Sequence, residues 1–353
     1  MRILVLTRYA RLGSSSRVRF YQYFPYLQAN GAKITCQSFF DNRYIQRLYW
    51  GKAYSANSLV AAYVKRLLIL GQTKRFDLLW IEKELFPLFP AGFEYLLHGL
   101  GVPYVVDYDD AVFHRYEMHN NTMVRSLLRN KIDHVMKNAK IVVAGNQYIA
   151  DRAIKAGAQN TIILPSVVDV DRYRTNAIGA SENIKIGWIG SPVTVPNLDV
   201  LREALVRFAI EVSLEFVLIG AGEAKLSPVI KTKNLVWNEN DEYLIGREFD
   251  VGVMPLIDGP FERGKCGYKL IQYMAAGLPV IASPVGVNST IVEHGVNGYL
   301  ATSTHEWLFA FQQLAESAER RAEMGKAGRQ KAKSLYDLKV TGPVLLDILS
   351  KAL

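Results

Sequence analysis

The sequence has little cysteine and no long apolar run. Its 353 residues include two cysteines, Cys36 and Cys266, which provide neither a disulfide framework nor a cysteine metal cluster and so favour a reducing compartment. The apolar run near the start ends at Arg8, which makes it too short for a signal-peptide core or a transmembrane helix. We therefore expect a cytoplasmic protein that is not secreted.

Several motifs of catalysis and recognition are also missing. No His-x-x-x-His spacing occurs, so we do not expect a zinc site. Gly13 is followed by three serines, and the run from Gly220 reaches Lys225 where a dinucleotide fingerprint has its third glycine. The sequence also contains no hydrolase nucleophile elbow and no recognised nucleic-acid-binding motif. These absences disfavour zinc enzymes, dinucleotide-dependent dehydrogenases, serine hydrolases and nucleic-acid-binding proteins.

Acidic residues are scarce in the first half of the chain. Residues 1–175 hold 24 Lys and Arg against 13 Asp and Glu, whereas the remainder holds 18 against 20, so the whole net charge of +9 comes from the first half. An anionic membrane surface, a phosphorylated lipid acceptor or a nucleic acid would each suit this excess. Residues 43–75 also mix Lys and Arg with Tyr and Trp beside the apolar segment Leu59–Leu70. This mixture suits an interfacial membrane contact, and equally a core helix with a solvated basic side.

Strand and helix patterns alternate along the chain, as in α/β proteins. The length suits two domains of about 150–200 residues. The small, polar stretch 176–183 predicts a linker, so we assign a first domain to 1–175, a second to 184–335 and a terminal helix to 336–353. Apolar runs predict strands at Ile3–Thr7, Leu78–Ile81, Tyr104–Val106, Ile141–Ala144, Ile162–Leu164, Lys185–Ile189, Leu214–Ile219, Val236–Trp237, Val251–Met254 and Val280–Ala282.

The sequence also predicts where several helices and turns lie. One amphipathic helix is expected from Val18 to Ala29, after the serine-rich loop. A second, basic helix is expected over Arg125–Lys140. Gly190-Ser191-Pro192 predicts a tight turn at the end of a strand.

The stretch Gly264–Asn288 combines a glycine loop, a helix start and the end of a strand. Lys265 lies in the loop, and Lys269 and Gln272 share one face of the helix expected at Tyr268–Ala276. Backbone amides and the helix dipole would face the same place as the lysines, which predicts an anion site. Ordinary solvated lysines are the alternative.

Part of this stretch resembles the donor-site helix of glycosyltransferase family 4. The resemblance rests on Lys269, on the run that begins at Tyr273 (YMAAG) and on Pro279-Val-Ile. The family often carries two glutamates eight positions apart here, where this chain has Gly264 and Gln272.

The resemblance extends beyond this helix. Pro165–Asp169 resembles the interdomain hinge of the family, and Ile291–Gly298 resembles one of its turns. It implies an α/β fold of two Rossmann-like domains of the GT-B type facing each other across a cleft. It also implies that the C-terminal helix crosses back to the first domain.

The resemblance implies a retaining glycosyltransferase. Such an enzyme would move a hexosyl or N-acetylhexosaminyl group from a UDP- or GDP-linked sugar to a glycan or a polyprenyl-diphosphate-linked acceptor. It would need no metal and no further cofactor. Bacterial surface polysaccharide or lipopolysaccharide synthesis would be its setting, in the cytoplasm or peripherally on the inner face of the cell membrane.

The resemblance also suggests which residues serve each substrate. Lys269, with Lys265, would stabilise the leaving diphosphate, Arg17 would join on closure, and Gln272 would hold the ribose or base. The donor-binding set is Gly13, Ser16, Arg17, Gly190, Lys265, Lys269, Gln272, Gly286 and Asn288.

Carboxylates gather after two strands of the first half. Glu82-Lys-Glu84 follows one strand, and Asp107, Asp109 and Asp110 with His114 follow the next, at the sheet edge where ligands bind. We favour Asp107 and Asp110 as catalytic or acceptor contacts, with His114 nearby. A D-x-D metal site and helix capping by Asp110 are alternatives.

Two other functions remain open. A nucleotide-sugar 2-epimerase shares the two-domain plan but needs carboxylates or histidines around the sugar, and the donor loop offers only Glu262. A non-catalytic lipid- or polyanion-binding module would explain the basic first half but gives the loop before Lys269 no role.

Overall fold

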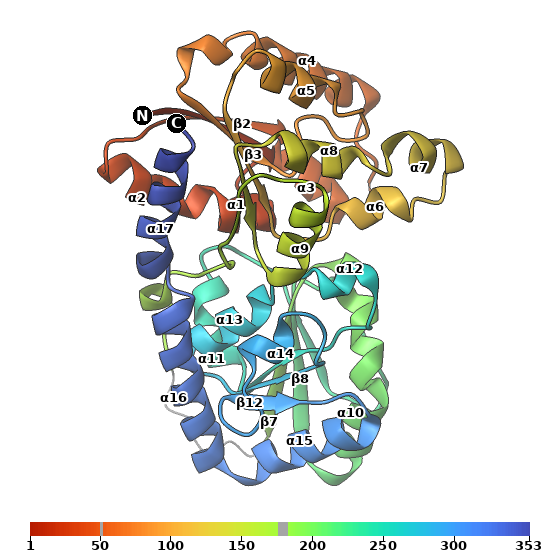
Figure 1. Cartoon of the computed structure of the whole chain (residues 1–353). Coiled ribbons are helices and arrows are strands. Elements are labelled where there is room, and N and C mark those ends of the chain that lie inside the picture. The colour runs from red at the N-terminus through yellow and green to blue at the C-terminus, as the bar shows by residue number, and fades with distance from the viewer. Residues whose placement is uncertain (50–51, 176–182) are drawn as a thin grey trace. The chain divides into compact units, whose positions relative to one another are not determined.

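The computed structural model describes residues 1–49, 52–175 and 183–353, so most of the expected linker lies outside the described residues. The described chain divides into two compact units (Figure 1). Unit 1 comprises Met1–Ser166, Arg263–Cys266 and Leu338–Leu353. Unit 2 comprises Val167–Glu262 and Gly267–Asp337.

Unit 1 is built on a six-stranded parallel sheet with the order β2-β1-β3-β4-β5-β6. Its central strands are apolar runs with buried side chains, as expected when helices cover both faces of a parallel sheet. The strands are β1 Arg2–Tyr9, β2 Lys33–Phe40, β3 Leu78–Glu82, β4 Tyr104–Tyr108, β5 Ile141–Ala144 and β6 Thr161–Ile163.

The helices of unit 1 correct two predictions. They are α1 Ser14–Arg19, α2 Phe24–Ala29, α3 Asn42–Tyr49, α4 Ala56–Leu70, α5 Gly92–Gly99, α6 Phe113–Glu117, α7 Thr122–Leu128, α8 Lys131–Asn138, α9 Gln147–Lys155 and α17 Leu338–Lys351. The single helix expected over Val18–Ala29 is wrong, because Phe20 leaves helical geometry to pack against Trp80, and the new helix α2 begins at Phe24 with Pro25 in its first turn. The helix expected over Arg125–Lys140 is also broken, between α7 and α8.

Unit 2 contains a second six-stranded parallel sheet, with the order β12-β11-β10-β7-β8-β9. Its strands are β7 Ile184–Ile189, β8 Leu214–Ile219, β9 Thr232–Leu235, β10 Val251–Met254, β11 Val280–Ala282 and β12 Gly298–Leu300. The strand expected at Val236–Trp237 is wrong, because β9 ends one residue earlier and the Val236 side chain is exposed.

Helices surround this second sheet. They are α10 Asp199–Glu211, α11 Ile245–Glu248, α13 Tyr268–Ala275, α14 Asn288–Ile291, α15 Thr304–Glu316 and α16 Ala318–Leu335, and the short α12 spans Pro260–Arg263. The turn expected at Gly190-Ser191-Pro192 leads into a 3-10 helix, Pro192–Leu198. Together the two sheets and their helices confirm the predicted α/β class.

The C-terminal helix α17 belongs to unit 1, as expected. The Thr341 hydroxyl forms a hydrogen bond of 2.9 Å with the Tyr23 hydroxyl. Gly342 faces the Tyr26 ring so closely that an added Cβ would lie 3.1 Å from it. The last residues of the chain are therefore built into the domain that contains the first.

A glycine contact in unit 2 gives a prediction about stability. A Cβ at Gly325 in α16 would lie 2.0 Å from the Gly277 carbonyl oxygen, whereas one at Gly328 would meet the flexible Met274 side chain at 3.1 Å. We expect Gly325→Ala to destabilise unit 2 by about 1–3 kcal/mol through overpacking. Gly328→Ala is the matched control, with a propensity gain of about 1 kcal/mol offsetting its milder clash. Thermal unfolding midpoints test this, and an equal midpoint for both variants would contradict the packing argument.

Candidate functional site

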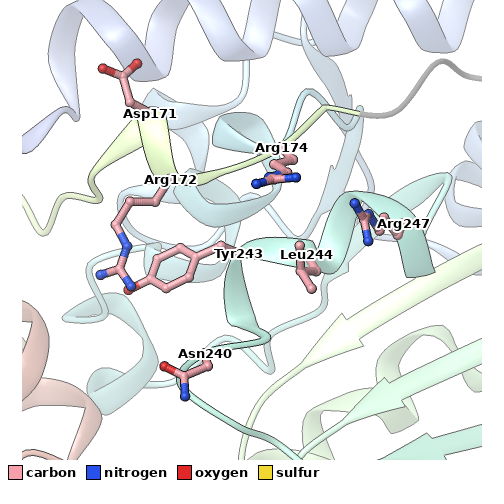
Figure 2. A pocket seen from close by; sticks show the side chains of 7 residues that line it. All are labelled: Asp171, Arg172, Arg174, Asn240, Tyr243, Leu244 and Arg247. Carbon is pink, nitrogen blue, oxygen red and sulfur yellow. The ribbon is translucent and has the colours of Figure 1, made fainter.

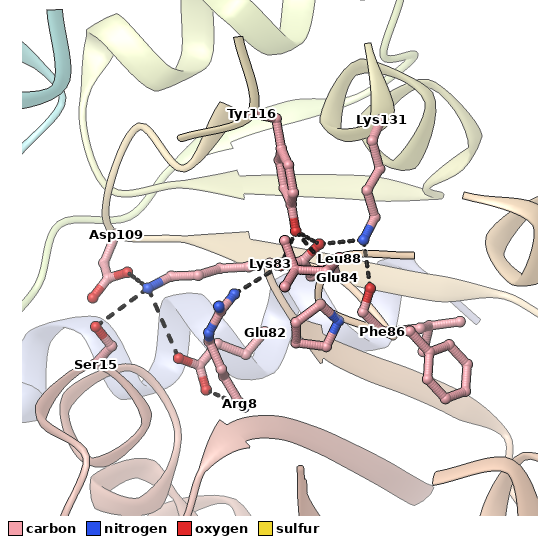
Figure 3. Close-up of polar contacts among 12 residues, drawn as sticks. Arg8, Ser15, Glu82, Lys83, Glu84, Phe86, Leu88, Asp109, Tyr116 and Lys131 are labelled. Atoms are coloured by element: carbon pink, nitrogen blue, oxygen red, sulfur yellow. Dashed lines mark hydrogen bonds and ion pairs between the residues drawn. The ribbon is translucent and has the colours of Figure 1, made fainter. Parts of the chain in front are cut away.

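Charged side chains gather at the carboxyl edge of the unit 1 sheet, where β1, β3 and β4 end (Figure 3). Glu82 ends β3 and lies in register with Asp107 of β4. The chain continues from Glu82 through Lys83 to Glu84, and all three side chains are buried. Buried charges persist only when they are paired and hydrogen-bonded, so the partners of each group define this site.

Glu84 is held by two cations and a phenol. Arg8 contacts one of its oxygens at 2.7 Å, Lys131 forms an ion pair with the other, and the Tyr116 hydroxyl donates to that second oxygen at 2.7 Å. Burial would raise the pKa of Glu84, but the charges of Lys131 and Arg8 hold it below its ordinary value. Both oxygens of Glu84 therefore have partners, and the carboxylate connects β1, α6 and α8 of unit 1.

Lys83 has a left-handed backbone, with φ of 65°, which is unusual for a residue with a side chain. The turn is held by a hydrogen bond from the Lys83 N–H to the Asp107 carbonyl at 3.0 Å. The Lys83 ammonium group lies 2.8 Å from the Asp109 carboxylate and 3.3 Å from the Ser15 hydroxyl (Figure 3). Burial opposes the charge, but Asp109 and its acidic neighbours raise the pKa of Lys83. Strained backbone at a ligand-binding edge of a sheet points to function.

Asp109 is the most exposed carboxylate of this cluster. Its side chain is 14% exposed, against 1% for Glu82 and Glu84. Burial would raise the pKa of Asp109, but Lys83 lowers it to about 2. Asp109 is therefore ionised at neutral pH and keeps part of its surface available to a ligand.

The loop after β1 and the helix α1 that follows it supply further partners of the cluster. Ser16 is buried and donates its hydroxyl to Glu82 at 2.6 Å, while accepting from the Tyr9 N–H at 3.0 Å. Gly13 lies against Tyr9 so closely that a Cβ would come within 2.3 Å. Arg17, on α1, is also mostly buried. These three residues were predicted to bind donor, and the structure shows Ser16 and Gly13 fixing the loop to the sheet.

Asp107 forms a bidentate ion pair with Arg19, at 2.7 and 3.2 Å. Arg19 also donates to the Leu164 carbonyl at 2.8 Å, and both charged side chains are almost completely buried. Burial raises the pKa of Asp107 despite its partner. This geometry favours a structural role for Asp107, and its predicted contact with an acceptor stays a prediction.

Asp110 and His114 do not take part in the ion pair between Asp107 and Arg19. The backbone of Asp110 accepts from Val112, and α6 begins at Phe113 without a side-chain cap, so the capping alternative is wrong. His114 contacts Glu117 at 3.0 Å and the Tyr148 hydroxyl at 2.9 Å. Burial lowers the pKa of His114, so the imidazole is mainly neutral at pH 7.

Residues Arg263–Cys266 pack within unit 1. Asn146 donates to the carbonyls of Gly264 and Lys265, at 2.8 and 3.1 Å. The Cys266 thiol donates to the Asp109 carbonyl at 2.9 Å, and burial raises its pKa. The thiol is therefore protonated and structural, and Lys265 belongs to unit 1 while Lys269 belongs to unit 2.

Unit 2 brings Lys269 to the carboxyl edge of its own sheet. The Lys269 ammonium lies 4.5 Å from the centre of the Trp188 ring, a cation–π contact between α13 and β7. Gly190 follows β7, and a Cβ there would lie 2.3 Å from the same ring. At the end of β8, Gly220 has φ of 78° and would clash with the Gly190 carbonyl if it carried a side chain. Bare backbone and a fixed cation therefore meet at this edge.

Gln272 lies beneath this edge in a buried hydrogen-bond cluster. Its amide donates to Glu242, and at 3.3 Å to the Tyr173 hydroxyl. Glu242 also accepts from the Tyr268 hydroxyl and the Trp237 indole, each at 3.2 Å. Glu242 is thus the centre of the cluster, and the sequence analysis missed it because its partners are scattered along the chain.

Asn288 is completely buried beside the start of α13. Its amide donates to the Ser283 carbonyl at 3.1 Å, and its carbonyl oxygen has no hydrogen-bond partner among the described residues. A Cβ at Gly267, whose φ is 64°, would lie 3.4 Å from that oxygen. Gly286, predicted to approach a phosphate, has φ of 55° in the preceding turn.

Neither a metal cluster nor a membrane span was found in the described residues. No group of three or more His, Cys, Asp or Glu side chains there could hold a metal ion. No helix in that part of the chain is both long and apolar enough to cross a bilayer.

Comparisons with known proteins add to this geometry. Residues 183–317 match the family model described as glycosyl transferases group 1. The chain is 33% identical over 83 residues to spore coat protein SA of Bacillus subtilis, covering 23% of this chain and 22% of that protein. It is 19% identical over 196 residues to TuaH of the same species, which is named a putative teichuronic acid biosynthesis glycosyltransferase, covering 50% and 48% of the two chains. The chain thus spans less than half the length of these curated relatives.

Solved structures resemble the whole chain. HepE from Anabaena, solved in complex with UDP, superimposes with a TM-score of 0.73 at 18% identity, covering 99% of this chain and 100% of that one. WaaG, a glycosyltransferase involved in lipopolysaccharide biosynthesis, gives a TM-score of 0.71 at 14% identity, with coverage of 99% and 100%. The fold is GT-B.

In this GT-B chain, the predicted site residues form separate groups. Unit 2 brings Lys269 together with the backbone of Gly190, and it buries Gln272 and Asn288. Unit 1 holds the Asp109 and Lys83 pair, which sequence reasoning passed over in favour of Asp107 and Asp110. The Glu82-Lys83-Glu84 run at the end of a strand could have indicated this pair. A lysine buried at such a strand end needs a carboxylate partner.

The Lys83–Asp109 pair predicts a specific acid sensitivity. The folded-state pKa of Asp109 is about 2, whereas an unfolded aspartate has a pKa of about 3.9. Its contribution to stability is therefore present above about pH 4 and lost as the pH falls toward 2. We expect Asp109→Asn to be less stable than wild type at pH 7 and to lose less stability on acidification, measured as unfolding midpoints.

The matched control is Asp347→Asn, which removes an exposed partner of Lys351 on α17. Exposed pairs contribute little, so its midpoints should follow those of wild type at each pH. Parallel acid curves for wild type and Asp109→Asn would contradict the assignment.

Proposed function

We propose that this protein is a retaining, metal-independent glycosyltransferase. It moves a hexosyl or N-acetylhexosaminyl group from a nucleotide sugar to a glycan or a polyprenyl-diphosphate-linked acceptor. The observation that carries the proposal is the fixed Lys269 cation beside the bare backbone at Gly190 and Gly220, within the segment that matches group 1 glycosyltransferases. HepE, which has the same fold, binds UDP and UDP-glucose, and this supports a UDP-linked donor.

The proposed reaction requires positive charge and backbone amides beside the leaving diphosphate. The bond between the sugar and the diphosphate breaks while the acceptor oxygen bonds to the same face of the sugar, and the acceptor proton passes to the leaving phosphate. Negative charge grows on the diphosphate during this step. Lys269 and the backbone amides near Gly190 stabilise that charge, the kind of interaction that supplies much of the catalysis in other enzymes.

Unit 1 supplies the acceptor contacts in this proposal. Asp109 is ionised and partly exposed, so its carboxylate accepts a hydrogen bond from an acceptor hydroxyl. Lys83 positions Asp109 and holds its charge. Asp107, Asp110 and His114 remain predicted members of the acceptor region, although the buried ion pair with Arg19 favours a structural role for Asp107.

The relatives suggest a setting for the proposed activity. TuaH carries a name from teichuronic acid biosynthesis, and WaaG is described as acting in lipopolysaccharide biosynthesis. We therefore place the protein in bacterial surface polysaccharide synthesis, on the cytoplasmic side of the membrane.

The experiment is incubation with radiolabelled UDP- and GDP-sugars, with and without lipid-linked acceptors. Label transferred only when acceptor is present supports the proposal. Interconversion of the nucleotide sugar without acceptor would instead identify an epimerase. Absence of turnover with every donor and acceptor would leave the binding module as the better description. The linkage formed, determined by NMR, tests retention.

Substitution of the donor-side lysine tests the mechanism. We expect Lys269→Ala to lower kcat by about 100-fold, because removal of one preorganised donor from a developing anion typically has this effect. Lys231→Ala is the control, since that exposed lysine pairs with Glu215 elsewhere in unit 2. Unchanged turnover in Lys269→Ala, with folding intact by circular dichroism, would remove Lys269 from the mechanism.

A surface of unit 1 fits the membrane contact in this proposal. Helix α4 exposes Val60, Val64, Leu67 and Leu68, whose exposed fractions are 62%, 47%, 43% and 66%, and Lys65 is exposed among them. Apolar side chains with adjacent cations suit the interface of an anionic bilayer. The first half of the chain, with 24 Lys and Arg against 13 Asp and Glu, adds long-range attraction.

Vesicle binding tests this surface. We expect the double variant Val60→Ser and Leu68→Ser to bind phosphatidylglycerol vesicles about tenfold more weakly than wild type, because two apolar contacts are lost. Ile210→Ser, which changes an apolar residue of unit 2 that is 76% exposed, should bind like wild type. Equal binding by both variants, or no wild-type binding at low salt, would contradict the membrane contact.

A further inference from the structure

A cationic pocket lies within unit 2, apart from the residues assigned to the donor (Figure 2). Its volume is about 500 Å³, within the range of pockets that hold small ligands. Three arginines contribute to its wall. The lining residues are Asp171, Arg172, Arg174, Asn240, Tyr243, Leu244 and Arg247. None of them belongs to the donor or acceptor residues named above.

The segment Asp171–Arg174 directs its arginines into this pocket. Tyr173 is buried and reaches the Glu242 cluster, whereas its neighbours Arg172 and Arg174 are exposed and line the pocket. Arg329 holds the segment from behind, donating to the Val170 and Tyr173 carbonyls at 3.4 and 3.2 Å. The backbone that carries these two arginines is therefore fixed on both sides.

Local packing positions the Arg172 guanidinium and the backbone that carries Arg174 and Arg247. Arg172 stacks on the Tyr243 ring, with 3.7 Å between its guanidinium carbon and the ring centre. Gly246 in α11 lies so close to the Arg174 carbonyl that a Cβ would come within 2.8 Å. This close approach brings Arg247, the next residue, beside Arg174 in the same wall (Figure 2).

The charge of the pocket is unbalanced. Within the described parts of the chain, no carboxylate forms an ion pair with Arg174 or Arg247, whereas Arg207 on α10 pairs with Glu203 at 2.5 Å. Asp171 offers one negative charge, but its carboxylate points away from the Arg172 guanidinium in Figure 2. Three guanidinium groups and one carboxylate leave an excess of two positive charges, which matches a dianion or trianion.

We infer that this pocket binds a small phosphate-class anion, either a phosphate monoester or a diphosphate. Guanidinium groups contact phosphate oxygens in pairs, which makes arginine better suited than lysine to such a ligand. The Asn240 side chain at the rim offers a further amide donor. This inference does not depend on the proposed transferase activity, because no donor-side residue takes part.

The test is calorimetric titration of the full chain with inorganic diphosphate and, separately, inorganic phosphate and a phosphate monoester. Saturating UDP is included so that a nucleotide site does not contribute. Wild type should bind diphosphate, with an affinity that falls as salt rises. The double variant Arg174→Ala and Arg247→Ala should bind about 100-fold more weakly, because two charge-assisted contacts are lost.

Arg207→Ala is the matched control, since it removes an exposed arginine of the same unit, and it should bind like wild type. Arg247→Gln gives a milder second variant, expected to lose about tenfold in affinity. Circular dichroism verifies that each variant is folded. Absence of saturable wild-type binding to both diphosphate and the phosphate monoester would overturn the inference, as would equal binding by the pocket variants and Arg207→Ala.

Discussion

The burial of paired charges at the carboxyl edge of the unit 1 sheet constrains much of this structure. Arg8, Glu84 and Lys131 come from three distant segments, and the buried charges of Glu84 and Lys131 are compensated by each other and by Arg8, whose side chain is 15% exposed. Removing one partner from such a set leaves an uncompensated charge, which costs several kcal/mol. The network therefore determines how the ends of β1 and β3 meet α8. These paired side chains line the carboxyl edge of the sheet, which is the edge where parallel sheets bind ligands.

Two carboxylates at this edge, Asp107 and Asp109, look alike in sequence but differ in their partners and their exposure. Asp107 is saturated by Arg19, and its oxygens are enclosed by protein. Asp109, two residues later, is held ionised by Lys83 yet keeps an exposed surface. The left-handed backbone at Lys83 produces this difference, because it turns the lysine toward the next strand rather than along its own. A strained residue thus positions the carboxylate that is best placed to contact a substrate.

The sequence predicts the strands better than the polar contacts. Parallel strands covered on both faces are continuous apolar runs, so β3, β4, β7 and β8 are visible without a structure. The Asp107–Arg19 pair joins residues 88 positions apart, and the Glu242–Gln272 contact joins residues 30 apart, so no local pattern announces either. Helix boundaries failed for a similar reason at Phe20, where packing against Trp80 overrides a helical periodicity. Tertiary contacts decided each of these cases.

Unit 2 shows how one backbone segment can serve two surfaces. Tyr173 points inward to Glu242 and Gln272, and its neighbours Arg172 and Arg174 point outward to the cationic pocket. Similarly, Glu242 is buried while the adjacent Tyr243 carries the stacked Arg172. The buried hydrogen bonds of Tyr173 and Glu242 therefore help to hold the two segments that carry the arginines against the mutual repulsion of their charges. An anion in the pocket would relieve that repulsion and steady the same two segments that support Gln272 in α13.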